Sequence, residues 1–255
     1  MKIVIIGAGN VASHIAQALS DSHEIAQVYS RSLEHAIAVA EPLGASAIND
    51  LEQVANDADV YLFSITDDAL PSVIDRLAHV NDHAVWAHTA GSRPMELFAG
   101  KMARYGVFYP LQTFTKGVPV EMSKVPFFIE AVDDATLAEL DTLAQAISTR
   151  VYHADSAMRK RMHVASVFAC NFTNYLWSVA DRLLSDHDIP FDVLAPLLEV
   201  TLNKALTIGP KAAQTGPARR GDRGVIEAHL AMLHDGDRDI YRLLSEEILK
   251  AYEQH

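Results

Sequence analysis

The chain has 255 residues, of which 49% are hydrophobic and 21% charged, and it carries a formal net charge of −12 at pH 7. This composition predicts a folded protein of one large domain or two smaller ones, and the acidic balance argues against a nucleic-acid partner. The single cysteine, Cys170, excludes an intrachain disulfide, and its apolar neighbours predict a buried thiol. No signal peptide, membrane-length apolar run or metal-ligand spacing of histidines is visible. We therefore expect a cytoplasmic protein with no membrane segment and no structural metal.

The chain opens with an apolar strand and a glycine turn. The strand is predicted over 2–6, and Gly7, Gly9 and Ala12 follow it in the spacing GxGxxA, ahead of a predicted helix. Gly7 allows a tight turn, Gly9 lets the backbone approach a pyrophosphate, and Ala12 permits close packing of helix on strand. The helix, which begins near Asn10, would direct its amides and positive dipole end at the phosphates. In this strand–turn–helix context the motif predicts dinucleotide binding, with contacts from Gly7, Gly9, Asn10 and Val11.

The end of the second predicted strand indicates which dinucleotide is bound. An NAD site commonly places an acidic residue there for the ribose 2′-hydroxyl, whereas this chain has Ser30, Arg31 and Ser32 after a strand expected over 24–29. A carboxylate would repel a 2′-phosphate, while a guanidinium and two hydroxyls would bind it. One of the serines could instead cap the helix predicted over 33–40, and the two roles are compatible. The sequence therefore favours NADP(H) over NAD(H).

Strands and helices alternate as far as residue 153. Further strands are expected over 45–48, 59–65, 84–88, 106–109, 126–131 and 150–153, and helices over 11–19, 33–40, 51–56, about 66–79 and 134–147. The alternation predicts an α/β fold with a doubly wound, mostly parallel Rossmann sheet in a first domain over 1–153. Because ligands bind at the carboxyl ends of parallel strands, Ser64, Ile65 and Thr66 should lie beside the cofactor.

Two loops at strand ends hold side chains that allow more than one interpretation. His88 could face the nicotinamide or substrate together with Ser92, or it could be a hydrogen-bonded structural histidine. We place His88 and Thr89 among the cofactor-binding candidates and leave this alternative open. Asp67 and Asp68 are predicted to cap the next helix rather than to take part in catalysis.

After residue 153 helical periodicity replaces the alternation. Helices are predicted over 155–185, 191–207, 224–233 and 237–252, with a loop rich in glycine, proline and arginine over 209–223. The sequence therefore predicts an all-helical second domain over 154–255.

A narrow polar stripe runs along the first of these helices. Its members recur at steps of three or four residues: Lys160, His163, Val167, Asn171, Asn174 and Ser178. The other faces are apolar, which predicts a buried helix, and a buried polar stripe must be satisfied by neighbours, water or a ligand. A stripe that faces solvent is the simpler alternative. If it faces a ligand, His163 could donate a proton during hydride transfer, Lys160 could do the same or bind a carboxylate, and Asn171 could orient the substrate.

The loop over 209–223 holds a second candidate site. Arg219 and Arg220 are adjacent among glycines and a proline, which is a compact arrangement for binding an anion. Asp222 could cap the following helix or pair with Arg220. The loop could also be a solvated surface connection. On the functional interpretation, Arg220 would bind a substrate carboxylate or phosphate, including across a dimer interface.

Taken together, these motifs resemble those of a known group of proteins. In the first half they are Gly7-x-Gly9-x-x-Ala12, Ser30-Arg31-Ser32, His88-Thr89-x-Gly91-Ser92 and Pro110-Leu111-Gln112-Thr113-Phe114. They resemble the Rossmann-like NADP oxidoreductases related to deazaflavin-coenzyme-dependent enzymes. In the second half, the motifs are His163 with Asn171, and Gly216-Pro217-x-x-Arg220-Gly221-Asp222 with His229-Leu230. These resemble the domain of unknown function that accompanies such oxidoreductases, so the resemblance covers nearly the whole chain.

The resemblance implies a fold and a cofactor but no substrate. The wider 6-phosphogluconate-dehydrogenase-like group includes pyrroline-5-carboxylate reductase, ketopantoate reductase, prephenate dehydrogenase and the β-hydroxyacid dehydrogenases. Its members pair a Rossmann domain with a helical domain, are often dimeric and place the active site in the cleft. Prephenate dehydrogenases carry His-Pro where Tyr109-Pro110 stands here, and β-hydroxyacid dehydrogenases carry a Lys-x-x-x-Asn helix, whereas Lys160 and Asn171 lie eleven residues apart. These departures leave the substrate and the catalytic acid open.

We therefore expect an NADP(H)-dependent oxidoreductase that transfers hydride between the nicotinamide and a small carbonyl, hydroxyl or imine substrate in an interdomain cleft. Two alternatives stay open: an NADP-binding sensor or scaffold without redox activity, and a reductase that exchanges hydride between NADP and a deazaflavin coenzyme. The resemblance and the apolar helix, which needs more cover than half a chain gives, predict a homodimer. The other expected partner is a small-molecule substrate, with neither nucleic acid nor membrane.

Overall fold

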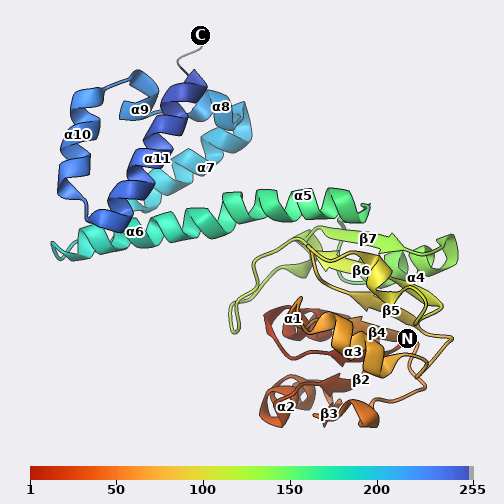
Figure 1. Cartoon of the computed structure of the whole chain (residues 1–255). Helices are drawn as coiled ribbons and strands as arrows, with labels where there is room; N and C mark the ends of the chain where they lie inside the picture. Colours follow the sequence, from red (N-terminus) through yellow and green to blue (C-terminus); the bar gives the residue numbers. More distant parts are fainter. Residues whose placement is uncertain (253–255) are drawn as a thin grey trace. The chain divides into compact units, whose positions relative to one another are not determined.

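The computed structural model describes residues 1–252, apart from the side chain of Asp235. The chain divides into two compact units, Met1–Asn171 and Phe172–His255. The first unit contains an eight-stranded sheet with helices, and the described part of the second is helical (Figure 1). The domain boundary expected after residue 153 follows the end of the last strand, whereas the compact units divide inside the helical segment that follows it. That boundary therefore stays a proposal.

The sheet has the strand order β3-β2-β1-β4-β5-β6-β7-β8. The strands are β1 (Lys2–Ile6), β2 (Glu24–Tyr29), β3 (Ser46–Ile48), β4 (Val60–Phe63), β5 (Val85–His88), β6 (Arg104–Pro110), β7 (Phe127–Ala131) and β8 (Val151–His153). All neighbours are parallel except β6 and β7, which pair antiparallel. The chain passes from β1 to β2 on one side and then crosses to β4 on the other, which creates the switch point where such sheets bind ligands. The predicted doubly wound, mostly parallel sheet is confirmed.

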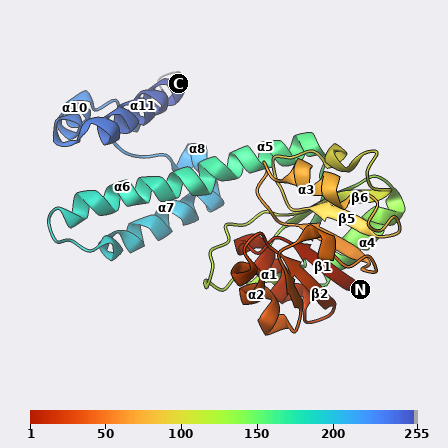
Figure 2. The same ribbon diagram turned by 60° about the horizontal axis from the view of Figure 1, so that its bottom comes forward.

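Helices cover both faces of this sheet (Figure 2). They are α1 (Asn10–Leu19), α2 (Leu33–Ala40), α3 (Leu70–Leu77) and α4 (Asp134–Gln145), and short 3₁₀ turns lie at Glu41–Leu43, Leu51–Gln53, Met95–Phe98 and Met122–Lys124. Along β1, Ile3 and Ile5 join a buried cluster with α1 and α4, whereas Val4 and Ile6 join a second cluster with α3. Successive strand side chains point to opposite faces, so a sheet covered on both sides needs unbroken apolar strands.

The helix expected over 155–185 forms, but it is not uniform. It consists of α5 (Ser156–Ser166), a π-helical stretch over Val167–Phe172 and α6 (Thr173–Ser185). A π-helical turn takes in one more residue than an α-helical turn, and such turns often mark functional sites. The spacing of three and four that defined the polar stripe assumes an unbroken α-helix. The stripe therefore does not continue on one face beyond residue 167.

The prediction that this helix is buried is wrong for a single chain. Large apolar side chains on it are exposed: Val164, Phe168, Phe172, Tyr175, Leu176 and Trp177. Phe168 has 65% of its surface accessible. Cys170 is also exposed, contrary to the predicted buried thiol. The apolar character of a side chain predicts that it is buried, but not whether its own chain or another chain buries it. Several exposed apolar side chains on one helical segment are typical of a contact surface.

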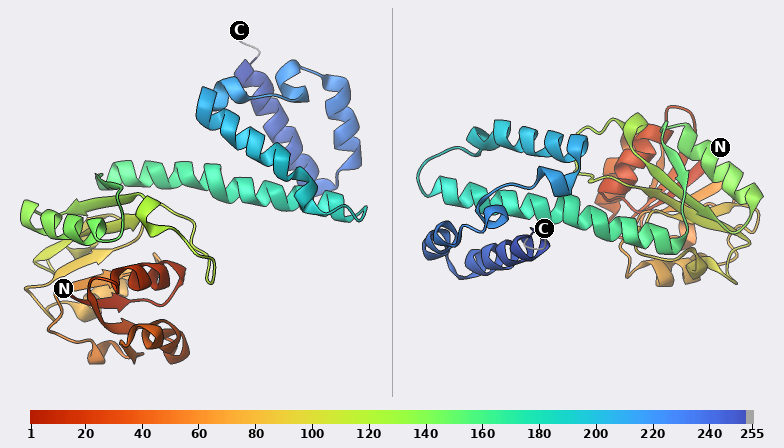
Figure 3. Two further views of the ribbon diagram at one scale, coloured as in Figure 1. Left: turned by 180° about the vertical axis from the view of Figure 1, so that it is seen from behind. Right: turned by 90° about the horizontal axis from the view of Figure 1, so that it is seen from above.

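The second unit is built from α6 and the helices that follow it (Figure 3). These are a 3₁₀ turn at Phe191–Leu194, α7 (Ala195–Ile208), α8 (Pro210–Ala213), α9 (Pro217–Arg220), α10 (Arg223–Met232) and α11 (Asp235–Tyr252). The segment expected to be a loop over 209–223 thus contains two short helices, each started by a proline. Ala218, Ile226 and Leu230 form a small buried cluster there. Within residues 1–252, no helix is long and apolar enough to cross a membrane.

Candidate functional site

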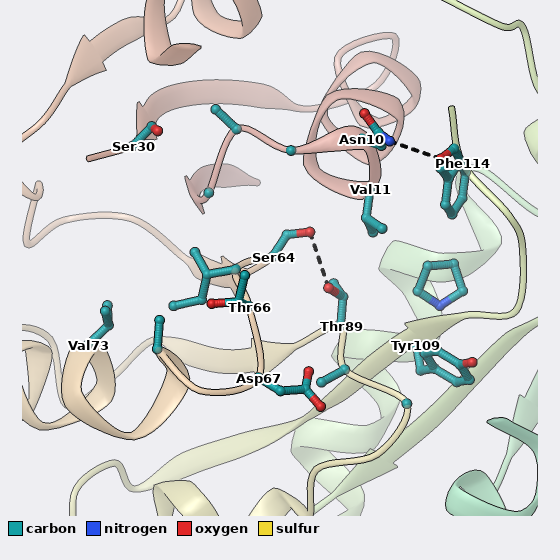
Figure 4. A pocket seen from close by; sticks show the side chains of 18 of the residues that line it. Asn10, Val11, Ser30, Ser64, Thr66, Asp67, Val73, Thr89, Tyr109 and Phe114 are labelled. Atoms are coloured by element: carbon teal, nitrogen blue, oxygen red, sulfur yellow. Dashed lines mark hydrogen bonds between the residues drawn. The ribbon is translucent and has the colours of Figure 1, made fainter. Parts of the chain in front are cut away.

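A cavity of about 580 Å³ lies in the first unit at the carboxyl ends of β1, β2, β4, β5 and β6. This is the size range of a cofactor or small-molecule site. It is lined by the glycine turn, the residues that follow β2, β4 and β5, the end of β6, and one residue of α5 (Figure 4). The switch point of the sheet is therefore hollow, as the fold requires of a ligand site.

The glycine turn has the backbone that the sequence motif predicts. Gly7 has a φ of +132°, and a Cβ at this position would lie 2.1 Å from the carbonyl oxygen of Ser64. Any other residue would therefore be strained and would clash with β4's continuation. Gly9 is the N-cap of α1 and has open space where a Cβ would stand. Since Gly9 has no side chain to cap α1, the first amides of the helix are left to a ligand anion.

At the β2 end, the cavity is lined by a permanently charged side chain, the guanidinium of Arg31. Ser30 and Arg31, which follow β2, line the cavity, and His35 of α2 joins them. Ser32 has a different place, because its Oγ accepts a hydrogen bond from the backbone N–H of His35 at 3.4 Å and so caps α2. The two compatible roles predicted for the serines thus fall on different residues. Sequence reasoning did not select His35, although its position one turn after Arg31 was the available signal.

The loops after β4 and β5 meet across the cavity. Ser64, Ile65, Thr66 and Thr89 all line it, and their predicted contact with a cofactor stays a prediction. The Thr89 hydroxyl hydrogen-bonds with the Ser64 hydroxyl, at an Oγ1–Oγ distance of 3.2 Å (Figure 4). The same Thr89 oxygen lies 3.3 Å from the carbonyl oxygen of Phe63. These bonds join the two loops, so the cofactor-facing edge of the sheet is fixed at its centre.

Asp67 and Asp68 do not cap α3, which corrects the sequence-based prediction. The helix begins at Leu70 with Ala69 as its N-cap. Asp67 lines the cavity and accepts a hydrogen bond from Ser92, while Asp68 lies 3.2 Å from a guanidinium nitrogen of Arg93. The carboxylates therefore tie the loop after β4 to the loop after β5.

The structure favours the structural interpretation of His88. This side chain is fully buried and is not among the residues that line the cavity. Its Nδ1 accepts a hydrogen bond from the N–H of Ala90 at 3.2 Å, so the ring proton is on Nε2, which donates to the carbonyl oxygen of Pro94 at 3.3 Å. Burial, with the nearby guanidinium of Arg159, lowers the pKa of His88 to about 4. A neutral His88 therefore shapes the loop that lines the cavity at Thr89, Ala90 and Gly91.

The far end of the cavity, at β6, brings together two groups that can exchange protons. His163 of α5 and Tyr109 of β6 both line it, and the Tyr109 hydroxyl lies 3.1 Å from His163 Nδ1. Burial raises the pKa of Tyr109, so its hydroxyl keeps its proton. Sequence reasoning placed Tyr109 only in a motif and missed this role. The available signal was its position at the carboxyl end of a strand that borders the site.

A buried charge network fixes α5 to the sheet. Arg159 is fully buried, forms an ion pair with Glu130 of β7 and donates to the carbonyl oxygen of Arg93 at 2.5 Å. The amide and hydroxyl of Ser156 donate to the same carboxylate of Glu130 at 2.9 and 2.8 Å. Because residues four apart lie on one helix face, this anchor places His163 one turn further along, at the cavity.

Two other predicted catalytic residues of the first unit do not line this cavity. Lys160 and Asn171 are exposed and are not among its lining residues. Arg220 is exposed on α9 in the second unit, where Asp222 caps α10 by accepting from the N–H of Val225 at 3.3 Å. Of the three candidates in the first unit, His163 lines this cavity together with the glycine turn. Among the described residues, no group of three or more His, Cys, Asp or Glu side chains is arranged to hold a metal ion.

A long loop between β6 and β7 is attached to the first helix. Asn10 Nδ2 donates to the carbonyl oxygen of Phe114 at 3.1 Å (Figure 4), and a ring nitrogen of His14 lies 3.0 Å from the carbonyl oxygen of Val118. Gln112 and Phe114 of this loop line the cavity. The loop therefore forms one wall of the cavity and is tied to α1, whose N-terminal residues also line it.

Comparison of the sequence and the structure with known proteins shows which family the chain belongs to. Residues 2–87 match the family described as coenzyme-F420-dependent NADP oxidoreductase, and residues 125–248 match a domain of unknown function, DUF2520. A solved structure from Bacteroides fragilis, provisionally named an NADP oxidoreductase, is 43% identical, covers 98% of each chain and superposes with a TM-score of 0.94. The chain belongs to this family of NADP oxidoreductases, in which the F420-dependent oxidoreductase domain is joined to DUF2520.

More distant structures share the fold alone. An imine reductase from Myxococcus stipitatus in complex with NADP⁺ is 13% identical, covers 100% of this chain and 93% of its own, and has a TM-score of 0.67. A 1-pyrroline-5-carboxylate reductase from Streptococcus pyogenes is 13% identical, with coverage of 100% and 99% and a TM-score of 0.65. No curated protein matches the sequence.

Proposed function

We propose that the protein binds NADP(H) in this cavity and transfers hydride between the nicotinamide and a small carbonyl, hydroxyl or imine carbon. One observation carries the proposal: His163, a proton-donating side chain, lines the same cavity as the glycine turn. With a pyrophosphate on the turn and a 2′-phosphate beside Arg31 at the β2 end, the nicotinamide would extend toward β5 and β6, where His163 and Tyr109 lie.

The chemistry of reduction needs both parts of this site. Hydride from the nicotinamide would reduce a carbonyl or imine carbon, and the oxygen or nitrogen that gains charge would take a proton from His163. The site residues would position the two reactants and supply the proton. Imine and pyrroline-5-carboxylate reductases with the same fold support a substrate with a C=N or C=O bond.

A turnover screen tests this function. The purified protein is incubated with NADPH and a panel of cyclic imines, 2-oxo acids and ketones, and with NADP⁺ and 3-hydroxy acids, while absorbance at the NADPH band is followed. We expect turnover of at least one class, and a fall of about a hundredfold or more in His163→Gln, the lower end of what general acid catalysis contributes. Tight NADPH binding without turnover across the panel would favour the sensor interpretation instead.

The preference for NADP(H) rests on the β2 end of the cavity. Arg31 and Ser30 line it, and His35 adds a third hydrogen-bond donor for a phosphate. In Arg31→Ala we expect the Kd for NADPH to rise about tenfold or more while the Kd for NADH changes little, because a charge-assisted bond to the 2′-phosphate is lost. Arg150→Ala, which removes an exposed arginine next to the opposite edge strand, is the matched control. Fluorescence titration measures the Kd for each cofactor in the wild type and in both variants, and equal losses for both cofactors in Arg31→Ala would contradict the assignment.

A hydride exchange with a deazaflavin is the second candidate. The match of residues 2–87 to a family described as coenzyme-F420-dependent favours it. Reduction of a deazaflavin by NADPH, followed through the loss of the deazaflavin absorbance, would separate this reaction from the reduction of an imine or carbonyl.

We also propose a homodimer that covers the exposed apolar side chains of the α5–α6 helix. The patch includes Phe168, Phe172 and Trp177, which a monomer would leave in water. Sedimentation should give twice the 27.9 kDa mass of the chain. Phe168→Glu should give the single mass, whereas Leu33→Glu, at an exposed apolar position of α2, should not. A wild-type protein that sediments as a monomer at micromolar concentration would refute the proposal.

A further inference from the structure

The loop over 111–126, between β6 and β7, is attached to α1 at two points. The first is at the cavity, where Asn10 Nδ2 donates to the carbonyl oxygen of Phe114 at 3.1 Å (Figure 4). Asn10, Gln112 and Phe114 all line the cavity. The second point is one helical turn further along α1, at His14, which is not among the lining residues. His14 can therefore affect a bound molecule through the loop that it holds.

Both ring nitrogens of His14 take part in this attachment. Nδ1 lies 2.8 Å from the carbonyl oxygen of Asn10, and Nε2 lies 3.0 Å from the carbonyl oxygen of Val118 in the loop. The imidazole also packs against the ring of Phe114, with 5.0 Å between the ring centroids. Carbonyl oxygens accept hydrogen bonds and cannot donate them. Both ring nitrogens must therefore donate if both contacts are to be hydrogen bonds.

The charge of His14 decides whether the two bonds can be made together. A neutral imidazole has one N–H, so whichever nitrogen carries it, the other directs a lone pair at a carbonyl oxygen. The same holds for either neutral tautomer, because both partners are carbonyls. The imidazolium has two N–H groups and donates to both, and bonds from a charged donor are the stronger ones. Histidine is the side chain that ordinarily changes charge between pH 5 and 8, so this attachment should respond to pH in that range.

The other ionisable groups around His14 belong to different classes of side chain. His14 is the only titratable residue of α1. The loop has three charged side chains, all exposed: Lys116, Glu121 and Lys124. The strands that pack on α1 carry three more groups: Lys2 of β1, and Glu24 and Tyr29 of β2. Lysine, glutamate and tyrosine ordinarily titrate outside the range of histidine, so a change in the loop near neutral pH can be assigned to His14.

We propose that His14, as an imidazolium, is a positioning residue for the dinucleotide: it holds the 111–126 loop as a wall of the cavity, and loss of its proton loosens that wall. With two N–H groups, His14 keeps Val118 bonded to α1. With one, the contact to Val118 competes with the contact to Asn10. Dinucleotide binding and protonation of His14 therefore favour each other, because linkage between two sites is reciprocal. This inference rests on the proposed function for the identity of the ligand, but not for hydride transfer.

The linkage is measured by fluorescence titration with NADPH and with NADH between pH 6 and pH 8.5. In His14→Gln, whose amide is neutral at every pH, we expect both Kd values to be about three- to tenfold above those of the wild type at pH 6, because a hydrogen bond from a charged donor is lost. At pH 8.5 the two proteins should agree. His83→Gln, which removes an exposed histidine before the amino end of β5, should match the wild type throughout.

The ratio of the Kd values of variant and wild type at each pH is the quantity to compare. His35 and His163, which line the cavity, titrate in all three proteins, so the ratio removes their effect. NADH serves as the second ligand because it lacks the 2′-phosphate, a group that itself titrates near pH 6. A ratio that stays constant from pH 6 to pH 8.5 would overturn the inference. A pH-dependent ratio for NADPH alone would assign the effect to the 2′-phosphate and would overturn it as well.

Amide hydrogen exchange tests the attachment of the loop without any ligand. At pH 6 the amides of the 111–126 loop should exchange about three- to tenfold faster in His14→Gln than in the wild type, while those of β5 should not change and so show that the variant is folded. Equal exchange of the loop in both proteins would contradict the positioning role. If neither cofactor binds, the proposed function fails, and the exchange of the loop alone decides the role of His14. Binding that is linked to His14 but gives no turnover would refute hydride transfer and support the inference.

Discussion

The buried histidine behind the cavity should make the first unit sensitive to acid. Neutral His88 accepts from the N–H of Ala90 through Nδ1 and lies near the guanidinium of Arg159. Protonation would point an N–H at an N–H and add a second charge to an interior that already holds one. The free energy of unfolding should therefore fall when the pH falls below the ordinary pKa of histidine.

The size and sign of the effect follow from the pKa of His88. Burial lowers it from 6.5 in an exposed side chain to about 4. The unfolded chain therefore binds the proton first, and the folded protein loses stability between pH 6.5 and pH 4, with no further loss from this group below pH 4. At about 1.4 kcal/mol for each pH unit, the whole loss is about 3 kcal/mol. Above pH 6.5 the contribution is complete and constant.

Urea unfolding at several pH values measures this contribution. Trp86 is buried in β5 beside His88, and its fluorescence reports the first unit once Trp177 has been replaced by Phe. In that background His88→Gln, whose amide can still donate to the carbonyl oxygen of Pro94, is less stable at pH 7 but lacks the histidine titration. Carboxylates titrate in both proteins and affect both equally. The quantity to follow is therefore the difference between their free energies of unfolding at each pH. If the two stability curves remain parallel from pH 7 to pH 4, the argument from burial is wrong.

Three further predictions concern the anchor, the turn and the loop. Arg159→Met should lower the free energy of unfolding by about 3–5 kcal/mol, because it leaves Glu130 buried without its partner, and urea titration of this variant beside Arg150→Ala measures the loss. Gly7→Ala should cost more than ~2 kcal/mol through its positive φ and its clash with the Ser64 carbonyl, while Gly44→Ala, which has a positive φ but open space, should cost less. His14→Phe should weaken NADPH binding by about three- to tenfold in a fluorescence titration, because the hydrogen bond to the loop carbonyl of Val118 is lost. An unchanged Kd would show that the loop needs no tie to α1.

The first half of the fold could be predicted because its signals are local. A strand buried on both faces is an apolar run, and a phosphate turn needs glycine where φ is positive, so both can be seen within a few residues. The start of α3 was misplaced for a local reason too. Asp67 and Asp68 are good capping residues, but Pro71 lies in the first turn of α3 and marks its actual beginning.

The end of the cavity that we propose for catalysis depends on contacts that the spacing of residues in the sequence does not reveal. Tyr109 and His163 are 54 positions apart, and they meet only because the network around Arg159 fixes α5 to β7. The polar stripe was drawn with a constant 100° per residue, and the π-helical stretch over 167–172 removes that constancy. Nothing in the sequence distinguishes an apolar residue that its own chain covers from one, such as Phe168, that its own chain leaves exposed.

The position of the Arg159 ion pair bears on His163 and Arg220 in different ways. Arg159 and His163 belong to the same helical segment, and both make their contacts within the first unit. His163, the proposed acid–base group, is therefore fixed by contacts within the first unit, whereas Arg220 belongs to the second. If Arg220 binds an anionic part of the substrate, Arg220→Ala should raise KM and change kcat little, whereas His163→Gln should lower kcat. An unchanged KM in Arg220→Ala would remove this residue from substrate binding.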